Sequence, residues 1–186
     1  MISDWITSID FSILNWIRDN IYNDTLDWIV PKITFLADKG WFFIVIAILL
    51  LLIKKTRKCG CCLAISYSLG FIFGNMIIKK SFARPRPYSQ VGGVTLLVDK
   101  LSDYSFPSAH TMIAFEFFAV MLMMPIKWIY KVIAGILAVA IALSRLYLYV
   151  HFPSDVIAGA ILGFIFGIMG VRILDMIMEE RKSRQS

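Results

Sequence analysis

The two histidines of this 186-residue chain both lie in segments whose side chains can bind and transfer a phosphoryl group. His110 lies in SFPSAHT and His151 lies in SRLYLYVHFPSD, and the basic stretch KKSFARPRP precedes both. Ionisable side chains are costly close to membrane-spanning segments, so their presence in a chain as apolar as this one predicts a function. The candidate site residues are Lys79, Arg86, Ser108, His110, Arg145, His151 and Asp155.

These residue types supply what removal of a phosphoryl group needs: a nucleophile, a proton donor for the leaving oxygen, and positive charge around the transferring oxygens. Arg86 and Arg145 can each bind two phosphate oxygens, and Lys79 adds a point charge. Ser108 lies where a helix is expected to begin, so its hydroxyl and the nearby amides can hold an anion. His110 falls in the first turn of that helix, close to the same anion.

His151 and Asp155 lie on either side of a sharp connection, because Pro153 prevents one helix from running through it. A carboxylate that is hydrogen-bonded to one imidazole nitrogen fixes the tautomer and leaves the other nitrogen free to attack phosphorus. Asp155 can also cap the helix that follows, instead of orienting the histidine or in addition to it. Glu116 is a further ionisable candidate, but interhelical hydrogen bonding is the favoured interpretation, and it is not part of the predicted site.

The composition predicts an integral membrane protein. Hydrophobic residues make up 59% of the chain, charged residues 17%, and the mean hydropathy is +0.74. Soluble domains carry roughly 45–50% apolar and about 25% charged residues. The net charge of +6 does not indicate a nucleic-acid partner, because no basic helix is interleaved with exposed aromatic side chains. The predicted fold class is all-α, a polytopic membrane helix bundle of about six transmembrane helices.

Five apolar stretches are strong helix candidates, and a weaker one, 24–38, is interrupted by charges and a proline, which leaves open whether it spans the membrane. Residues 1–22 carry apolar side chains and two tryptophans at helical spacing, which predicts an interfacial amphipathic helix, with packing against the bundle as the alternative. A membrane-embedded domain, 23–178, and a basic cytoplasmic tail, 179–186, follow. The strong candidates are 41–53, 61–78, 109–124, 130–149 and 155–174.

The placement of basic residues predicts the orientation of the bundle. Lysines and arginines follow 41–53, separate 109–124 from 130–149, and follow the last helix, so these three places should face the cytoplasm. All seven candidate site residues then lie on the extracytoplasmic face. Four cations in KKSFARPRP break the rule on that face, and an anionic substrate would account for them. A rim that contacts lipid headgroups is the alternative for Lys80 and Arg84.

Taken together, the three segments resemble the type 2 phosphatidic acid phosphatase superfamily, which also includes vanadium haloperoxidases and glucose-6-phosphatase. Its pattern is a lysine, six residues and Arg-Pro; then Pro-Ser-Gly-His; then Ser-Arg, five residues, a histidine, three residues and an aspartate. Order and spacing agree in all three segments, and the resemblance covers about residues 40–175. Ala109 in place of the glycine is the one departure. The matching residues are Lys79, Arg86 and Pro87; Pro107, Ser108 and His110; and Ser144, Arg145, His151 and Asp155.

The resemblance implies a role for each matched residue. His151 would form a phosphohistidine that Asp155 orients, and His110 would protonate the leaving group and then activate the hydrolytic water. Members of this family need no metal, so no metal and no cofactor are expected. The residues implied to bind the phosphoryl oxygens are Lys79, Arg86, Ser108 and Arg145. If Ala109 is helical, its methyl group is harmless; at positive φ it would cost roughly 1–2 kcal/mol.

The predicted activity is hydrolysis of a membrane lipid phosphate in a bacterial plasma membrane, by a multi-pass enzyme that works on the extracytoplasmic side. Within the superfamily the chain resembles small bacterial undecaprenyl-diphosphate phosphatases, and phosphatidylglycerophosphate and phosphatidic acid are the alternative substrates. Phosphate transfer to an acceptor other than water stays open, as does a lipid or ion transporter outside the enzymes. The expected partners are the lipid substrate and the bilayer, with no nucleic acid and no obligatory protein partner.

Overall fold

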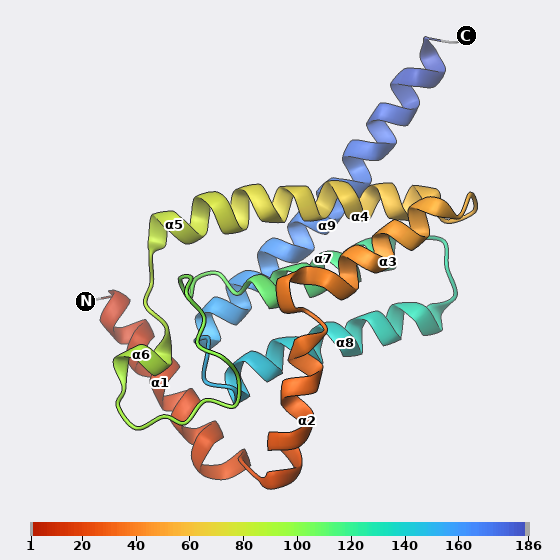
Figure 1. Cartoon of the computed structure of the whole chain (residues 1–186). Coiled ribbons are helices and arrows are strands. Elements are labelled where there is room, and N and C mark those ends of the chain that lie inside the picture. The colour runs from red at the N-terminus through yellow and green to blue at the C-terminus, as the bar shows by residue number, and fades with distance from the viewer. Residues whose placement is uncertain (1, 185–186) are drawn as a thin grey trace.

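The computed structural model describes residues 2–184, and all regular secondary structure in that range is helical (Figure 1), which confirms the all-α prediction. Met1 and the last two residues of the predicted basic tail lie outside the described range. The predicted tail is helical as far as Ser183, because the last helix continues through it. The elements are α1 (Ile2–Ile21), α2 (Asp24–Phe35), η1 (Asp38–Gly40), α3 (Trp41–Leu52), α4 (Arg57–Leu69), the π-helical η2 (Gly70–Ile78), α5 (Lys79–Phe82), α6 (Pro87–Gln90), α7 (Ala109–Met123), α8 (Trp128–Tyr147) and α9 (Pro153–Ser183).

Four helical stretches in the described chain are long and apolar enough to cross a membrane, and α7, with 15 residues, is a shorter apolar helix beside them. The predicted number of six spans is not confirmed, because α2 and α3 together make up a single candidate span, Asp24–Leu52. The two helices are steeply inclined to each other (Figure 1). Contacts place both ends of α2 at one end of the bundle: Asn23 bonds to Tyr147, and Asp38 bonds to His110.

Helix α1 lies at this same end of the bundle and keeps its apolar face exposed. Trp5 is 67% exposed and Trp16 is 58% exposed, whereas Asp10 and Leu14 on the opposite face are buried. Leu14 packs against Tyr149 and Phe152 of the connection between α8 and α9. The outward apolar face agrees with the predicted interfacial helix, and the inward face shows that α1 also packs against the bundle.

Glycines on α9 allow its backbone to approach α7 closely, as their four-residue spacing indicates. A Cβ at Gly159 would lie 2.6 Å from the carbonyl oxygen of Ser108, and one at Gly163 would overlap the carbonyl oxygen of Met112. The close approach matters for function because α7 begins beside His110 and α9 begins beside Asp155. The amide of Ser108 donates to the carbonyl of Asp155 at 3.1 Å, which joins the two helix starts.

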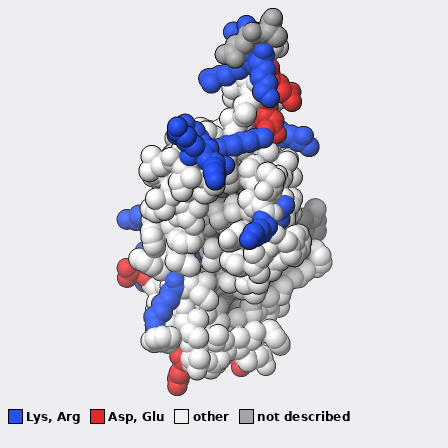
Figure 2. All heavy atoms as spheres, turned by 90° about the vertical axis from the view of Figure 1, so that its right-hand side faces the viewer, with Lys and Arg blue, Asp and Glu red and all other residues white. Residues whose placement is uncertain are grey.

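The opposite end of the bundle carries a cluster of exposed basic residues. Lys54 and Lys55 in the connection between α3 and α4 are exposed, as are Arg57 and Lys58 in the first turn of α4. Figure 2 faces this end and shows a largely uncharged surface on which lysine and arginine side chains gather in a few clusters. All seven candidate site residues lie at the other end, around the starts of α7 and α9 and the end of α8, so their predicted convergence on one end is confirmed.

Candidate active site

His151 lies on the connection between α8 and α9, with its two ring nitrogens in different surroundings. Nε2 lies 3.1 Å from Nη1 of Arg86, and because a guanidinium can only donate, Nε2 must be the unprotonated, accepting nitrogen. Nδ1 therefore carries the proton, and it faces the hydroxyl of Ser105 at 3.4 Å. The side chain is only 1% exposed. In this tautomer the lone pair lies on Nε2, the nitrogen that faces Arg86.

Asp155 does not bond directly to His151, contrary to the expected hydrogen bond. Its Oδ2 lies 3.7 Å from Nδ1, and the Ser105 hydroxyl, which donates to Oδ2 at 2.5 Å, approaches both groups. Oδ2 also accepts the amide of Phe152 at 2.9 Å, which caps α9. Asp155 thus caps the helix, as expected, and it reaches the imidazole through Ser105. Its role in orienting the histidine stays a prediction.

Arg86 and Lys79 converge on the carboxylate of Asp103, from the loop before α7. Nη2 of Arg86 lies 2.5 Å from Oδ1, and Nζ of Lys79 lies 2.7 Å from Oδ2. Arg86 also donates to the carbonyl of Val150 at 2.8 Å, which ties it to the connection that carries His151. A carboxylate bound by two cations stands where two oxygens of a phosphoryl group could be bound in the same geometry.

The other two charged candidates approach from α7 and α8. His110 bonds through Nε2 to Oδ1 of Asp38 at 2.7 Å, and this partner comes from the turn between α2 and α3. Arg145 is 1% exposed and donates to the hydroxyl of Thr34. Its Nε has no hydrogen-bond partner among the described residues, so the guanidinium retains a free donor inside the protein.

Ser108 is the N-cap of α7, where its hydroxyl accepts the amide of Thr111 at 3.5 Å and lies 2.9 Å from the Thr111 hydroxyl. Ala109 is the first residue of the helix and is not among the positive-φ residues. Its methyl group is therefore tolerated at a position where the family pattern has glycine, as expected for a helical residue.

A cavity of about 720 Å³ lies at the centre of these groups. Lys79, Arg86, His110 and His151 line it, together with Asp103. Arg145 lines a neighbouring cavity of about 450 Å³ between α2 and the loop before α7. Ser108 and Asp155 are buried behind the cavity lining. The structure thus brings four of the seven predicted residues to one cavity and places the other three around it.

Electrostatics favour a neutral His151 and a charged Asp103. Burial, reinforced by the positive charge of Arg86, lowers the pKa of His151 well below its ordinary range, which keeps the lone pair on Nε2 available. Burial by itself would raise the pKa of Asp103, but its hydrogen bond and ion pair with Lys79, together with Arg86, lower it to about 2. Asp103 is therefore an anion at every ordinary pH.

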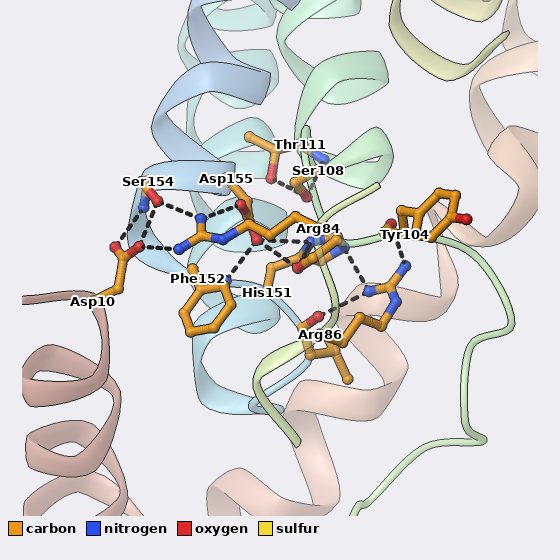
Figure 3. Close-up of polar contacts among 12 residues, drawn as sticks. Asp10, Arg84, Arg86, Tyr104, Ser108, Thr111, His151, Phe152, Ser154 and Asp155 are labelled. Carbon is orange, nitrogen blue, oxygen red and sulfur yellow. Dashed lines mark hydrogen bonds and ion pairs between the residues drawn. The ribbon is translucent and has the colours of Figure 1, made fainter. Parts of the chain in front are cut away.

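Sequence reasoning missed Ser105, Asp103 and Asp38, and it left Arg84 among residues of uncertain purpose. Arg84 bonds to Asp155 and to Asp10 of α1, neither of which is close to it in sequence (Figure 3). The sequence did signal that Arg84 is unusual, because it is a positive charge on the predicted outer face. That signal did not show which residues Arg84 binds. Among the described residues no group of three or more His, Cys, Asp or Glu side chains is placed to hold a metal ion, and metal independence stays a prediction.

Known proteins with similar sequences and structures include phosphatases. A sequence model described as the PAP2 superfamily matches residues 58–179. The chain belongs to the PAP2 superfamily. It is 38% identical over 142 residues to an undecaprenyl-diphosphatase of Sulfolobus acidocaldarius, an alignment that covers 75% of this chain and 68% of that protein. As a PAP2 protein with membrane-spanning helices, it is an integral membrane lipid phosphatase.

Two solved PAP2 structures share the fold. LpxE of Aquifex aeolicus superposes with a TM-score of 0.77 at 30% identity, covering 87% of this chain and 94% of that one. A transmembrane PAP2-type phosphatidylglycerolphosphate phosphatase from Bacillus subtilis gives a TM-score of 0.74 at 27% identity, covering 92% and 86%. The PAP2 match begins at residue 58, so α1, α2 and α3 lie outside it, although Thr34 and Asp38 contact candidate site residues and Asp10 bonds to Arg84.

Proposed function

We propose that this PAP2 phosphatase hydrolyses undecaprenyl diphosphate to undecaprenyl phosphate and inorganic phosphate through a phosphohistidine on His151. The observation that carries the mechanism is the orientation of His151. Nε2 carries the lone pair beside Arg86 at the cavity, and Nδ1 faces Ser105 and, beyond it, Asp155. This is the arrangement that a nitrogen nucleophile with a fixed tautomer requires.

In the first step, Nε2 of His151 attacks the terminal phosphorus, and the bond from phosphorus to the bridging oxygen breaks. His110 gives its proton to that leaving oxygen, and undecaprenyl phosphate departs. In the second step, water attacks the phosphohistidine while His110 takes its proton, which releases inorganic phosphate and restores both histidines. The groups that stabilise the charge on the phosphoryl oxygens are Lys79, Arg86, Ser108 and Arg145.

Binding of phosphate at Lys79 and Arg86 requires the carboxylate of Asp103 to move, because it occupies both cations. Its side chain is 49% exposed and lies on a loop, so it can leave without disrupting a packed core. Arg145 can contribute its free Nε donor once the substrate is present. Neither step calls for a metal ion, and we propose that the enzyme is metal-independent.

The choice of lipid rests on similarity to the undecaprenyl-diphosphatase described above. The likeness to a phosphatidylglycerolphosphate phosphatase supports that lipid as the second candidate, with phosphatidic acid as a third. We further propose a bacterial plasma membrane location with the site on the extracytoplasmic side. The cluster of exposed basic residues where α3 gives way to α4, at the opposite end of the bundle, supports this orientation.

The test is phosphate release by purified protein in detergent, measured side by side on the three lipids in the presence of a chelator. Undecaprenyl diphosphate should give the highest kcat/KM, and His151→Ala should abolish turnover. Faster turnover of phosphatidylglycerophosphate would make that lipid the substrate in place of undecaprenyl diphosphate and would leave the proposed mechanism unchanged. Retention of more than a few per cent of the activity by His151→Ala would remove this residue as the nucleophile.

A further inference from the structure

Arg84 is one of the six residues that the first motif leaves unspecified between Lys79 and Arg86, yet it binds the carboxylate that serves the nucleophile. Its Nη1 donates to Oδ1 of Asp155 and to the hydroxyl of Ser154, both at 2.7 Å. Its guanidinium also lies over the ring of Phe152, 3.9 Å from the centroid. Because Oδ2 of Asp155 is bonded to Ser105 and the Phe152 amide, Arg84 fixes the other oxygen and with it the plane of the carboxylate.

Arg84 is in turn held by helix α1. Its Nη2 donates to Oδ2 of Asp10 at 2.8 Å, and Asp10 is 3% exposed. Asp10 also accepts the amide of Ser154 through Oδ1 at 2.9 Å and the Ser154 hydroxyl through Oδ2 at 2.5 Å. One carboxylate from α1 therefore binds both the arginine and the first turn of α9, as Figure 3 shows.

These contacts exclude Arg84 from the set of phosphate ligands. Both of its terminal nitrogens are directed at carboxylates and hydroxyls, and it does not line the cavity that contains Lys79, Arg86, His110 and His151. It is 19% exposed, so the alternative of an open rim in contact with lipid headgroups does not fit either. What remains is a structural bridge between two buried anions, which a planar, forked cation suits better than an ammonium.

We propose that Arg84 and Asp10 are positioning residues for catalysis, so that helix α1, outside the matched PAP2 region, completes the active site. Asp10 holds Arg84, Arg84 holds Asp155, and Asp155 acts on His151 through Ser105. The inference rests on the proposed roles of His151 and Asp155. It predicts that loss of the Asp10 charge slows the chemical step without weakening phosphate binding, since neither residue reaches the phosphate ligands.

The experiment measures kcat, KM and inhibition by inorganic phosphate for Asp10→Asn and Arg84→Lys, with Asp19→Asn as the matched control. Asp19 is an exposed acidic residue on the same helix, with a side chain 62% exposed. We expect kcat to fall about tenfold or more in both variants, as for loss of a hydrogen bond to a charged group, while KM and phosphate inhibition stay within about twofold. Asp19→Asn should match the unaltered enzyme.

Thermal unfolding in detergent is measured on the same samples, because loss of a buried charge partner can destabilise the protein. If Asp10→Asn does not fold, Arg84→Lys, which keeps the positive charge, decides the question. An unchanged kcat, or a loss of kcat matched by an equal rise in KM, overturns the inference. His151→Ala assayed in parallel separates the cases: an active His151→Ala contradicts the proposed nucleophile, whereas an inactive one with a fully active Asp10→Asn contradicts only the role of α1.

Discussion

His151 and Asp155 are separated by 3.7 Å between Nδ1 and Oδ2, and the hydroxyl of Ser105 lies within hydrogen-bonding distance of both. The connection from carboxylate to imidazole therefore runs largely through a serine on the loop before α7. This loop also carries Asp103, which is bound by Lys79 and Arg86. One loop thus contacts both the orienting side of the histidine and the phosphate-binding cations.

Replacement of Ser105 by alanine should impair the nucleophile. The variant removes the hydroxyl that links His151 to Asp155, and a hydrogen bond to a charged group is worth about 1.5–3 kcal/mol, so kcat should fall roughly 10- to 100-fold. Steady-state phosphate release measures the effect. Ser81→Ala serves as the control, since its exposed hydroxyl donates to the carbonyl of Ile77, one turn earlier in the chain. Equal activity of the two variants would show that the Ser105 hydroxyl between His151 and Asp155 does not contribute to catalysis.

Replacement of Asp103 by asparagine should strengthen phosphate binding. The carboxylate competes with the substrate for Lys79 and Arg86, and without its charge inorganic phosphate should inhibit at a concentration about three- to tenfold lower. Because the pKa of Asp103 is about 2, no assay at ordinary pH mimics the variant. Asp99→Asn removes the same charge from the same loop and provides the control. Weaker inhibition of Asp103→Asn would mean that Asp103 holds the cations in a binding geometry that phosphate needs.

Stability should decline in mild acid because of His151. Its pKa is lowered in the folded protein, chiefly by burial, so the unfolded chain binds a proton near pH 6.5 and the folded chain does not. A group that binds more protons when unfolded makes the free energy of unfolding fall as the pH drops, so the loss begins below about pH 6.5 and is absent above it. The Tm in detergent should decrease from pH 7 to pH 5, and the decrease should be smaller for His151→Gln. Parallel curves for the two proteins would contradict this account.

Much of the site could be predicted from the sequence because its chemistry is carried by local motifs. A histidine four residues before an aspartate, on either side of Pro153, predicts a turn that brings the two together. Ser108 before an apolar stretch predicts a helix start, and the structure places the N-cap of α7 there. The apolar composition and the positions of the basic residues predicted a membrane bundle with the candidate residues at one end, which the structure confirms.

Contacts between distant segments could not be predicted in this way, because no local pattern encodes them. Asp10 and Ser154 are 144 positions apart, and His110 and Asp38 are 72 apart, yet each pair is hydrogen-bonded. The segment 24–38 gave a weak sign of a spanning helix, whereas packing places its last residue, Asp38, against His110 and its first turn against Tyr147 at the end of α8. The sequence by itself determined which groups could transfer a phosphoryl group. Only the tertiary structure decided which neighbours hold them, because a hydrogen bond depends on distance in space rather than on spacing along the chain.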